Sequence, residues 1–238
     1  MANLLEPLTE ITLADFNVLC TKAEGRDKLA RLCQYLARAI VGGMAVRAPT
    51  SGSLFAKLEG HARTVMVQLA SARRTHRWCK EFPVIQSIPQ LFQVADPIDR
   101  AFELLQKISL ATFMITDHIG QLKQWKILSG GKRSGTGTVQ LGLKFFCVSN
   151  FIGVLYQLKK INDMGGKEEK APQRRNCAET AVKHALLVLQ TAHLSLLWES
   201  HDGIVGLAGI VTSWMDLIAQ LPAKPPVKVS PDAKSMAK

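Results

Sequence analysis

Hydrophobic residues recur at helical spacing along most of the chain, and no alternating apolar and polar run is long enough to build a sheet. Thr12 followed by Asp15 resembles a capping box and predicts the start of a first helix. A second apolar pattern runs from Gly25 to a predicted break at residues 42–43, and a later stripe covers residues 98–122. The pattern therefore predicts an all-α fold of amphipathic helices plus one or two membrane-embedded helical hairpins.

The amphipathic pattern is most pronounced at residues 54–80. At about 100° per residue, one narrow face collects the apolar residues Leu54, Leu58, Ala62, Val65, Leu69 and Ala72. The basic residues lie opposite this stripe or along its borders: Lys57, Arg63, Arg73, Arg74, Arg77 and Lys80. Such a helix can lie in a membrane interface, with cationic side chains reaching lipid phosphate. A core helix with a solvated basic face is the alternative that composition leaves open.

From this pattern we predict one set of membrane-binding residues. They combine part of the apolar stripe with the basic residues that would reach head groups: Leu58, Arg63, Val65, Leu69, Arg73, Arg74, Arg77 and Lys80.

Two later stretches reach the roughly 20 residues that a bilayer-crossing helix needs. Residues 134–158 contain one charge, Lys144, and residues 203–223 contain one charge, Asp216. A charge at mid-bilayer costs about 2.5–3.5 kcal/mol, so neither stretch is a clean span and a soluble helical bundle remains the alternative. Glycines at positions 203, 206 and 209 would admit a closely packed neighbouring helix.

These patterns divide the chain into three parts. Residues 1–97 form an N-terminal helical region that contains the membrane-remodelling helix at 54–80. Residues 98–221 form an apolar helical region with candidate membrane segments at about 134–158 and 203–221. Residues 222–238 form a basic tail rich in proline and lysine.

The composition narrows the choice of partner and compartment. The chain has 30 Lys and Arg against 19 Asp and Glu, a formal net charge of +11, which suits a polyanion such as nucleic acid or anionic lipid head groups. Five cysteines, widely spaced and never in a C-x-x-C pair, indicate reduced thiols in a cytosol-facing protein.

No catalytic pattern is present. Nucleophile-elbow, zinc-protease and zinc-deaminase motifs are absent. The glycine-rich residues 129–137 differ from a Walker loop, because Lys126 stands where a glycine is required and Arg133 follows Lys132. We therefore expect no enzymatic activity, no cofactor and no metal site.

A family resemblance makes the prediction specific. One block closely resembles the N-terminal block of the peroxin-eleven family of peroxisomal membrane proteins: Gly25, Arg26, Asp27, Lys28, Gln34, Tyr35 and Arg38. Similar blocks follow in order: residues 71–74 with Arg77, then Asp117-His118 with Trp125, then residues 201–203 with Gly206, Gly209 and Ser213. The resemblance spans most of residues 25–221.

The resemblance implies a peroxisomal (or glycosomal) membrane protein that elongates the organelle membrane and promotes proliferation and fission. We expect the helix at 54–80 to wedge into one leaflet and the first block, residues 25–38, to support self-association. The implied partners are an anionic phospholipid membrane, further copies of the chain and the organelle fission machinery, with no nucleic acid. The alternatives are a small-solute channel around Asp117, Lys144 and Asp216, and a soluble nucleic-acid-binding protein.

Overall fold

The computed structural model describes residues 11–166 and 168–221, and within these ranges it contains helices and no strand. The predicted all-α class is therefore confirmed, while the basic tail at 222–238 lies outside the described residues. The α-helices are α1 (Leu13–Thr21), α2 (Ala23–Arg47), α3 (Leu54–Thr75), α4 (Glu81–Gln86), α5 (Pro97–Gln124), α6 (Gly135–Met164), α7 (Ala171–Leu194) and α8 (Asp202–Ile218). Two short 3₁₀ turns, η3 (Pro89–Gln93) and η4 (Glu168–Lys170), complete the elements.

Local side-chain caps explain where several helices begin. The predicted capping box at Thr12 and Asp15 is present at the start of α1. Ser53 accepts a hydrogen bond of 3.2 Å from the Ala56 amide at the start of α3, and Ser134 accepts one from Gly137 at the start of α6. These side chains satisfy backbone N–H groups that have no partner within the helix.

Two predicted boundaries were wrong. The glycine pair at 42–43 does not break α2, which continues to Arg47. Gly42 is instead a packing position, because a Cβ built there would lie 2.1 Å from the amide nitrogen of Gly203. The helix predicted for residues 54–80 ends at Thr75, and Cys79 has a φ of 67°, which an α-helix cannot continue through.

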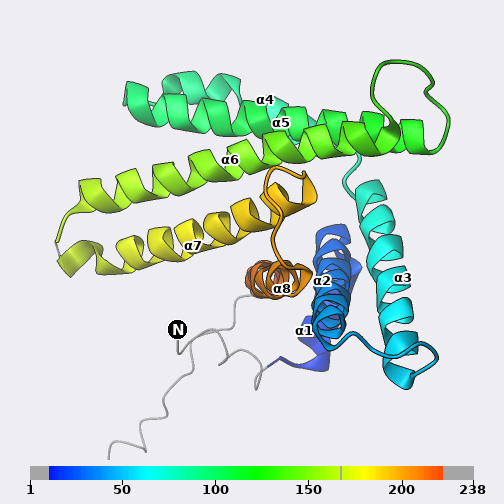
Figure 1. Cartoon of the computed structure of the whole chain (residues 1–238). Coiled ribbons are helices and arrows are strands. Elements are labelled where there is room, and N and C mark those ends of the chain that lie inside the picture. Colours follow the sequence, from blue (N-terminus) through cyan, green and yellow to red (C-terminus); the bar gives the residue numbers. More distant parts are fainter. Residues whose placement is uncertain (1–10, 167, 222–238) are drawn as a thin grey trace, which may run out of the picture.

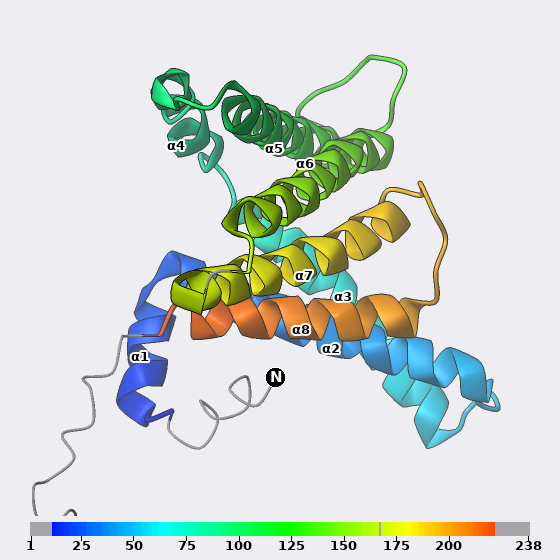
Figure 2. The same cartoon turned by 90° about the vertical axis from the view of Figure 1, so that its left-hand side faces the viewer.

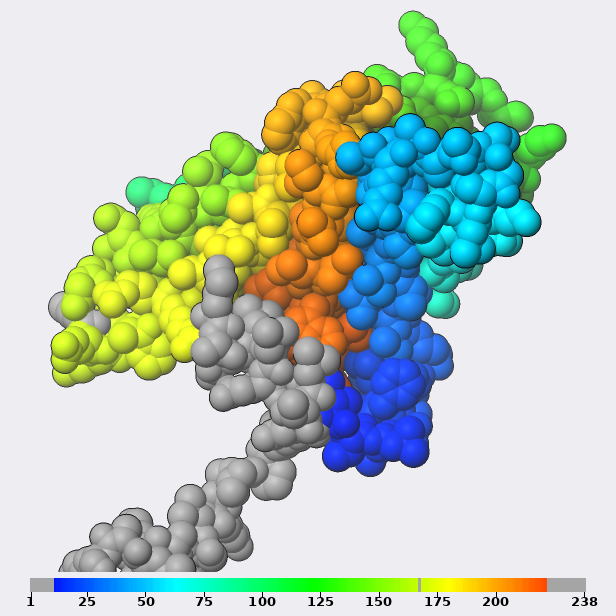
Figure 3. Space-filling view, turned by 60° about the horizontal axis from the view of Figure 1, so that its bottom comes forward, coloured from blue at the N-terminus to red at the C-terminus, as the bar shows by residue number. Residues whose placement is uncertain are grey.

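The helices follow one another in space as a folded row (Figure 1). α5 packs on α6, α6 on α7 and α7 on α8. α8 then packs along α2, and α2 packs on α3, so the first and last long helices lie side by side (Figures 2 and 3). The row closes on itself where α3 touches α5.

The close contact between α2 and α8 depends on glycine. A Cβ built on Gly206 would lie 2.5 Å from the Ala39 amide nitrogen, and one on Gly209 would lie 2.1 Å from the Tyr35 ring. The close approach predicted from the glycine spacing is thus confirmed. α8 has 17 residues, about 26 Å at 1.5 Å per residue, which is shorter than the ~30 Å hydrocarbon core of a bilayer.

Asp216 of α8 lies in a buried ion network. Its carboxylate is 2.9 Å from Arg31 and 3.2 Å from Lys28 of α2, and it also contacts Lys183 of α7. Burial raises the pKa of Asp216, but the three cations outweigh burial and leave the pKa below its ordinary value. This charge, which cast doubt on residues 203–223 as a membrane segment, is therefore neutralised by neighbouring helices.

By length and composition, α6 is the one helix among the described residues that could cross a membrane. Its 30 residues span about 45 Å, and it coincides with the predicted segment at 134–158. Several of its apolar side chains face outward: Phe145, Val148, Phe151, Leu155 and Leu158.

The glycine contact predicts a clear effect of added side-chain volume. Gly206→Ala should lower the free energy of unfolding by about 1–3 kcal/mol, because its methyl group would collide with the backbone of α2. Gly43→Ala, in open space on the same pair of helices, should raise it by about 0.5–1 kcal/mol. Thermal unfolding in detergent, followed by circular dichroism, measures both. Equal effects of the two substitutions would contradict the packing account.

Candidate functional site: the outer edge of α3 and a basic cavity

The predicted apolar stripe of α3 is divided by the packing of the helix. Ala62 is buried against Ala37 and Val41 of α2, with Met66 beside them. Leu58 and Val65, on the other border of the stripe, are 43% and 44% exposed. α2 thus covers one side of the stripe and leaves the other side open.

We call the open side the outer edge of α3. Its apolar members are Leu54, Leu58 and Val65, and the exposed Lys57 borders them. The exposed Arg63 lies on the opposite side of the helix. Arg63 pairs with Glu59 one turn away, at 2.7 Å, and keeps more than half of its side chain exposed. Leu69, the third apolar residue of the predicted membrane-binding set, is only partly exposed.

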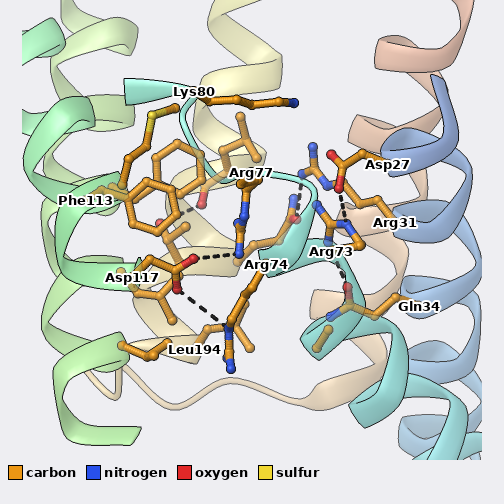
Figure 4. A pocket seen from close by; sticks show the side chains of 18 of the residues that line it. Asp27, Arg31, Gln34, Arg73, Arg74, Arg77, Lys80, Phe113, Asp117 and Leu194 are labelled. Carbon is orange, nitrogen blue, oxygen red and sulfur yellow. Dashed lines mark hydrogen bonds and ion pairs between the residues drawn. The ribbon is translucent and has the colours of Figure 1, made fainter. Parts of the chain in front are cut away.

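The other basic residues of the predicted set turn inward. Arg73 donates hydrogen bonds to Asp27 (3.1 Å) and to Gln34 (2.7 Å), both on α2. Just after α3, Arg77 donates to Asp117 of α5 at 2.9 Å, and Arg74 lies 3.6 Å from the same carboxylate. Figure 4 shows these arginines lying between α5 and α2.

Lys80 completes the inward-facing basic group. Its ammonium contacts the carboxylate of Glu24 in the first turn of α2. The four basic residues at 73, 74, 77 and 80 therefore have carboxylate partners inside the chain.

Burial affects the protonation of this cluster. It lowers the pKa of Arg73 to about 10, although the nearby Asp27 carboxylate acts in the opposite direction. Burial also lowers the pKa of Arg74, against the effect of Asp117. Both guanidinium groups are nevertheless ion-paired, Arg73 with Asp27 and Arg74 with Asp117.

Most residues of the first family block also point inward. Asp27, Gln34 and Tyr35 are buried, and Arg38 contacts Asp202 at the start of α8. The position of Gly25 requires a glycine, because a Cβ there would lie 2.0 Å from the Leu19 carbonyl oxygen.

The two remaining residues of the block are Lys28, which is partly buried, and Arg26, which is exposed. Lys28 reaches Asp216 and Glu24. Arg26 is exposed and donates to the Cys20 carbonyl at 3.2 Å.

The inward-facing residues of both sets meet at one cavity of about 620 Å³. From α2 the cavity receives Asp27, Lys28, Gln34, Tyr35 and Arg38, and from α3 and the turn after it Arg73, Arg74, Arg77 and Lys80. Two sets of residues that the sequence singled out for different reasons are therefore neighbours in space.

The opposite wall of the cavity was not found by sequence reasoning. It comes from α5, α6 and α7 and is mostly apolar, with Phe113, Leu143, Phe146 and Leu187 among its members and Asp117, Gln140 and Gln190 among its polar residues. Phe113 and Phe146 stack with ring centroids 4.5 Å apart. Such residues look like ordinary core positions in sequence, so no signal marked them.

Of the three residues of the alternative channel, one lines this cavity. Asp117 lines the cavity, where it pairs with Arg74 and Arg77, but Lys144 and Asp216 are not among the residues around it.

Among the described residues, exposed apolar side chains and one helix long and apolar enough to cross a bilayer fit the class of membrane-associated helical proteins. The family model described as Peroxisomal biogenesis factor 11 (PEX11) matches residues 13–221. The chain belongs to this family, and it is a peroxisomal membrane protein with a role in peroxisome biogenesis and proliferation. Searches of curated proteins and of solved structures found no significant match.

The ion pairs of Asp117 predict a measurable loss of stability. Asp117→Asn should lower the free energy of unfolding by about 2–3 kcal/mol. This is less than for a fully buried pair, because the side chains of Arg74 and Arg77 remain 20% and 22% exposed. Chemical denaturation in detergent measures the effect.

Glu59→Gln is the matched control, because it removes the surface pair with Arg63 on the same helix. It should change the free energy of unfolding by less than about 0.5 kcal/mol. Similar losses for the two variants would contradict the structural importance given to the Asp117 pairs.

Proposed function

We propose that this protein elongates the peroxisomal membrane, and so promotes proliferation and fission, by inserting the outer edge of α3 into one leaflet. The observation that carries the proposal is the division of the stripe. Leu58 and Val65 are large apolar residues left open on a helix whose neighbouring face is already packed on α2. Transfer of a row of exposed apolar side chains from water into lipid lowers the free energy, so these residues favour membrane insertion.

The charge beside the edge favours an anionic bilayer. Lys57 is exposed about 60° around the helix from Leu54, where its head can reach phosphate groups, whereas Arg63 lies on the opposite side of the helix. Each basic residue near an anionic surface contributes about 1 kcal/mol, and added salt weakens that attraction. Insertion of these apolar side chains into one leaflet expands that leaflet relative to the other, which favours membrane curvature and elongation.

The four inward-facing basic residues have a different role in this proposal. Arg73 and Arg77 hold the end of α3 to α2 and α5, so the helix enters the lipid as part of a folded body. The membrane-binding set is thereby narrowed to the residues of the outer edge. Arg73, Arg74, Arg77 and Lys80 act on the membrane only through the position they give to α3.

The α5–α6 pair supports a second contact with the bilayer. α6 is long and apolar enough to cross it. Along α5 a row of apolar side chains at intervals of seven, three, seven and four residues is exposed on one face: Ile98, Leu105, Ile108, Ile115 and Ile119. We propose that this pair anchors the protein while the outer edge of α3 remodels the surface.

Self-association and recruitment of the fission machinery complete the proposal. Arg26 is the charged residue of the family block that stays exposed, and Leu36 and Ile40 on the same helix are exposed apolar residues. Concentrating several copies would place several wedges in one membrane patch.

The proposal predicts that two valines of α3 behave differently. Val65 belongs to the outer edge, whereas Val67 lies about 200° away around the helix, and both are exposed, at 44% and 58%. Val65→Asp should abolish elongation of peroxisomes when the variant is overproduced, because a carboxylate would enter the hydrocarbon region. Fluorescence imaging with a peroxisomal marker measures the elongation.

Val67→Asp is the matched control and should elongate peroxisomes as the wild-type chain does. It introduces the same charge on the same helix, outside the proposed wedge. Normal elongation by Val65→Asp, or equal loss in the two variants, would refute insertion of the outer edge.

A separate prediction concerns self-association. Arg26→Glu should reduce co-precipitation of two differently tagged copies and leave peroxisomal targeting intact, because Arg26 makes no ion pair within the described chain. Arg175→Glu changes an exposed arginine on α7 and should have no effect. Unchanged co-precipitation of the Arg26 variant would exclude this residue from the contact.

A further inference from the structure

The basic cavity has two chemically different walls. One consists of cationic and polar side chains of α2, α3 and the turn after α3, and Figure 4 shows the arginines of this wall facing Phe113 and Asp117 of α5. The other, from α5 to α7, is mostly apolar and includes Val139, Leu143 and Leu187, with polar residues such as Gln140 and Thr191 between them. A cavity that is cationic on one side and apolar on the other matches a molecule with an anionic head and an alkyl chain.

The charges around the cavity do not balance. Seven of its lining residues are Lys or Arg and three are Asp or Glu. Two more carboxylates reach lining cations from outside, Asp202 at Arg38 and Asp216 at Arg31. Seven cations therefore face five carboxylates, and an excess of positive charge in a partly buried space favours binding of an anion.

Two arginine donors at the cavity are unused. The Nε–H groups of Arg38 and Arg77 are buried and have no hydrogen-bond partner among the described residues, although each side chain makes an ion pair through another nitrogen. Buried donors in folded proteins nearly always find an acceptor. Both residues line the cavity, and a small rotation of each guanidinium would bring its Nε–H to the acceptor oxygens of a phosphate or carboxylate bound there.

We propose that this cavity binds one single-chain anionic amphiphile, with its phosphate or carboxylate head at the arginines of α2 and α3 and its alkyl chain along the wall from α5 to α7. The volume of about 620 Å³ lies in the usual range of ligand sites, roughly 300–1,000 Å³.

The site is separate from the proposed wedge, since Leu54, Leu58 and Val65 are not among the residues around the cavity. A bound amphiphile would add a contact between the inner end of α3 and α5–α7, beside the ion pairs of Asp117 and the hydrogen bond from Trp78 to Gln121.

Binding is tested on the full chain in neutral maltoside detergent, with octyl phosphate as the probe and inorganic phosphate and octyl glucoside as comparisons. Octyl phosphate should raise the melting temperature at concentrations where neither comparison does, because only it carries both head and chain. Arg77→Gln should weaken binding about tenfold or more by removing charged donors at the head group. Arg63→Gln, an exposed arginine before the inner cluster, should bind as the wild type does.

A second variant keeps the test decisive if Arg77→Gln fails to fold. Leu143→Trp fills the apolar end and leaves every charge in place, so it should lose octyl phosphate while retaining butyl phosphate. Equal stabilisation by inorganic phosphate would mean that the site takes a free anion only, and equal stabilisation by octyl glucoside would mean an alkyl site only. Equal weakening by Arg63→Gln and Arg77→Gln would place the anion on the surface. Each of these results overturns the proposal and leaves the Val65 experiment unaffected.

Discussion

The arrangement depends on two buried carboxylates that receive their cations from the same end of α3. Asp27 on α2 and Asp117 on α5 are each only 2% exposed, and a buried carboxylate without a partner is strongly destabilising. Arg73 pairs with the first, and Arg74 and Arg77 pair with the second. These pairs join α3 to both α2 and α5, and so add a second connection between the α2–α8 and α5–α7 parts of the fold beside the packing of α7 on α8.

This constraint gives the two ends of α3 different environments. The inner end is fixed by ion pairs beside a cavity, whereas the outer edge presents Leu54, Leu58 and Val65 with no covering helix. A peptide with the same sequence would lack the carboxylates and would expose all of its basic residues. The folded chain instead presents a short apolar edge in a fixed orientation, which suits the proposed wedge better than a free helix, because less conformational entropy is lost on binding.

Sequence patterns located the helices well because caps and periodicity are local. The box at Thr12 and the caps at Ser53 and Ser134 use side chains within three residues of their partners. The direction of the arginines was not predictable in this way. Arg73 and Arg77 meet carboxylates 46 and 40 residues away. Because of these pairs, the face of α3 that is buried is not centred on its apolar stripe. Asp216 shows the same limit, because three cations from two other helices neutralise a charge that looked costly in an apolar segment.

The most direct test of the central claim is a fluorescence measurement of lipid contact on the two sides of α3. In a chain whose five native cysteines are replaced, Val65→Cys and Val67→Cys would each carry an environment-sensitive fluorophore. On vesicles containing anionic lipid, the account predicts a blue shift and quenching by brominated acyl chains for the label at position 65 alone. Equal quenching at both positions, or none at position 65, would contradict insertion of the outer edge.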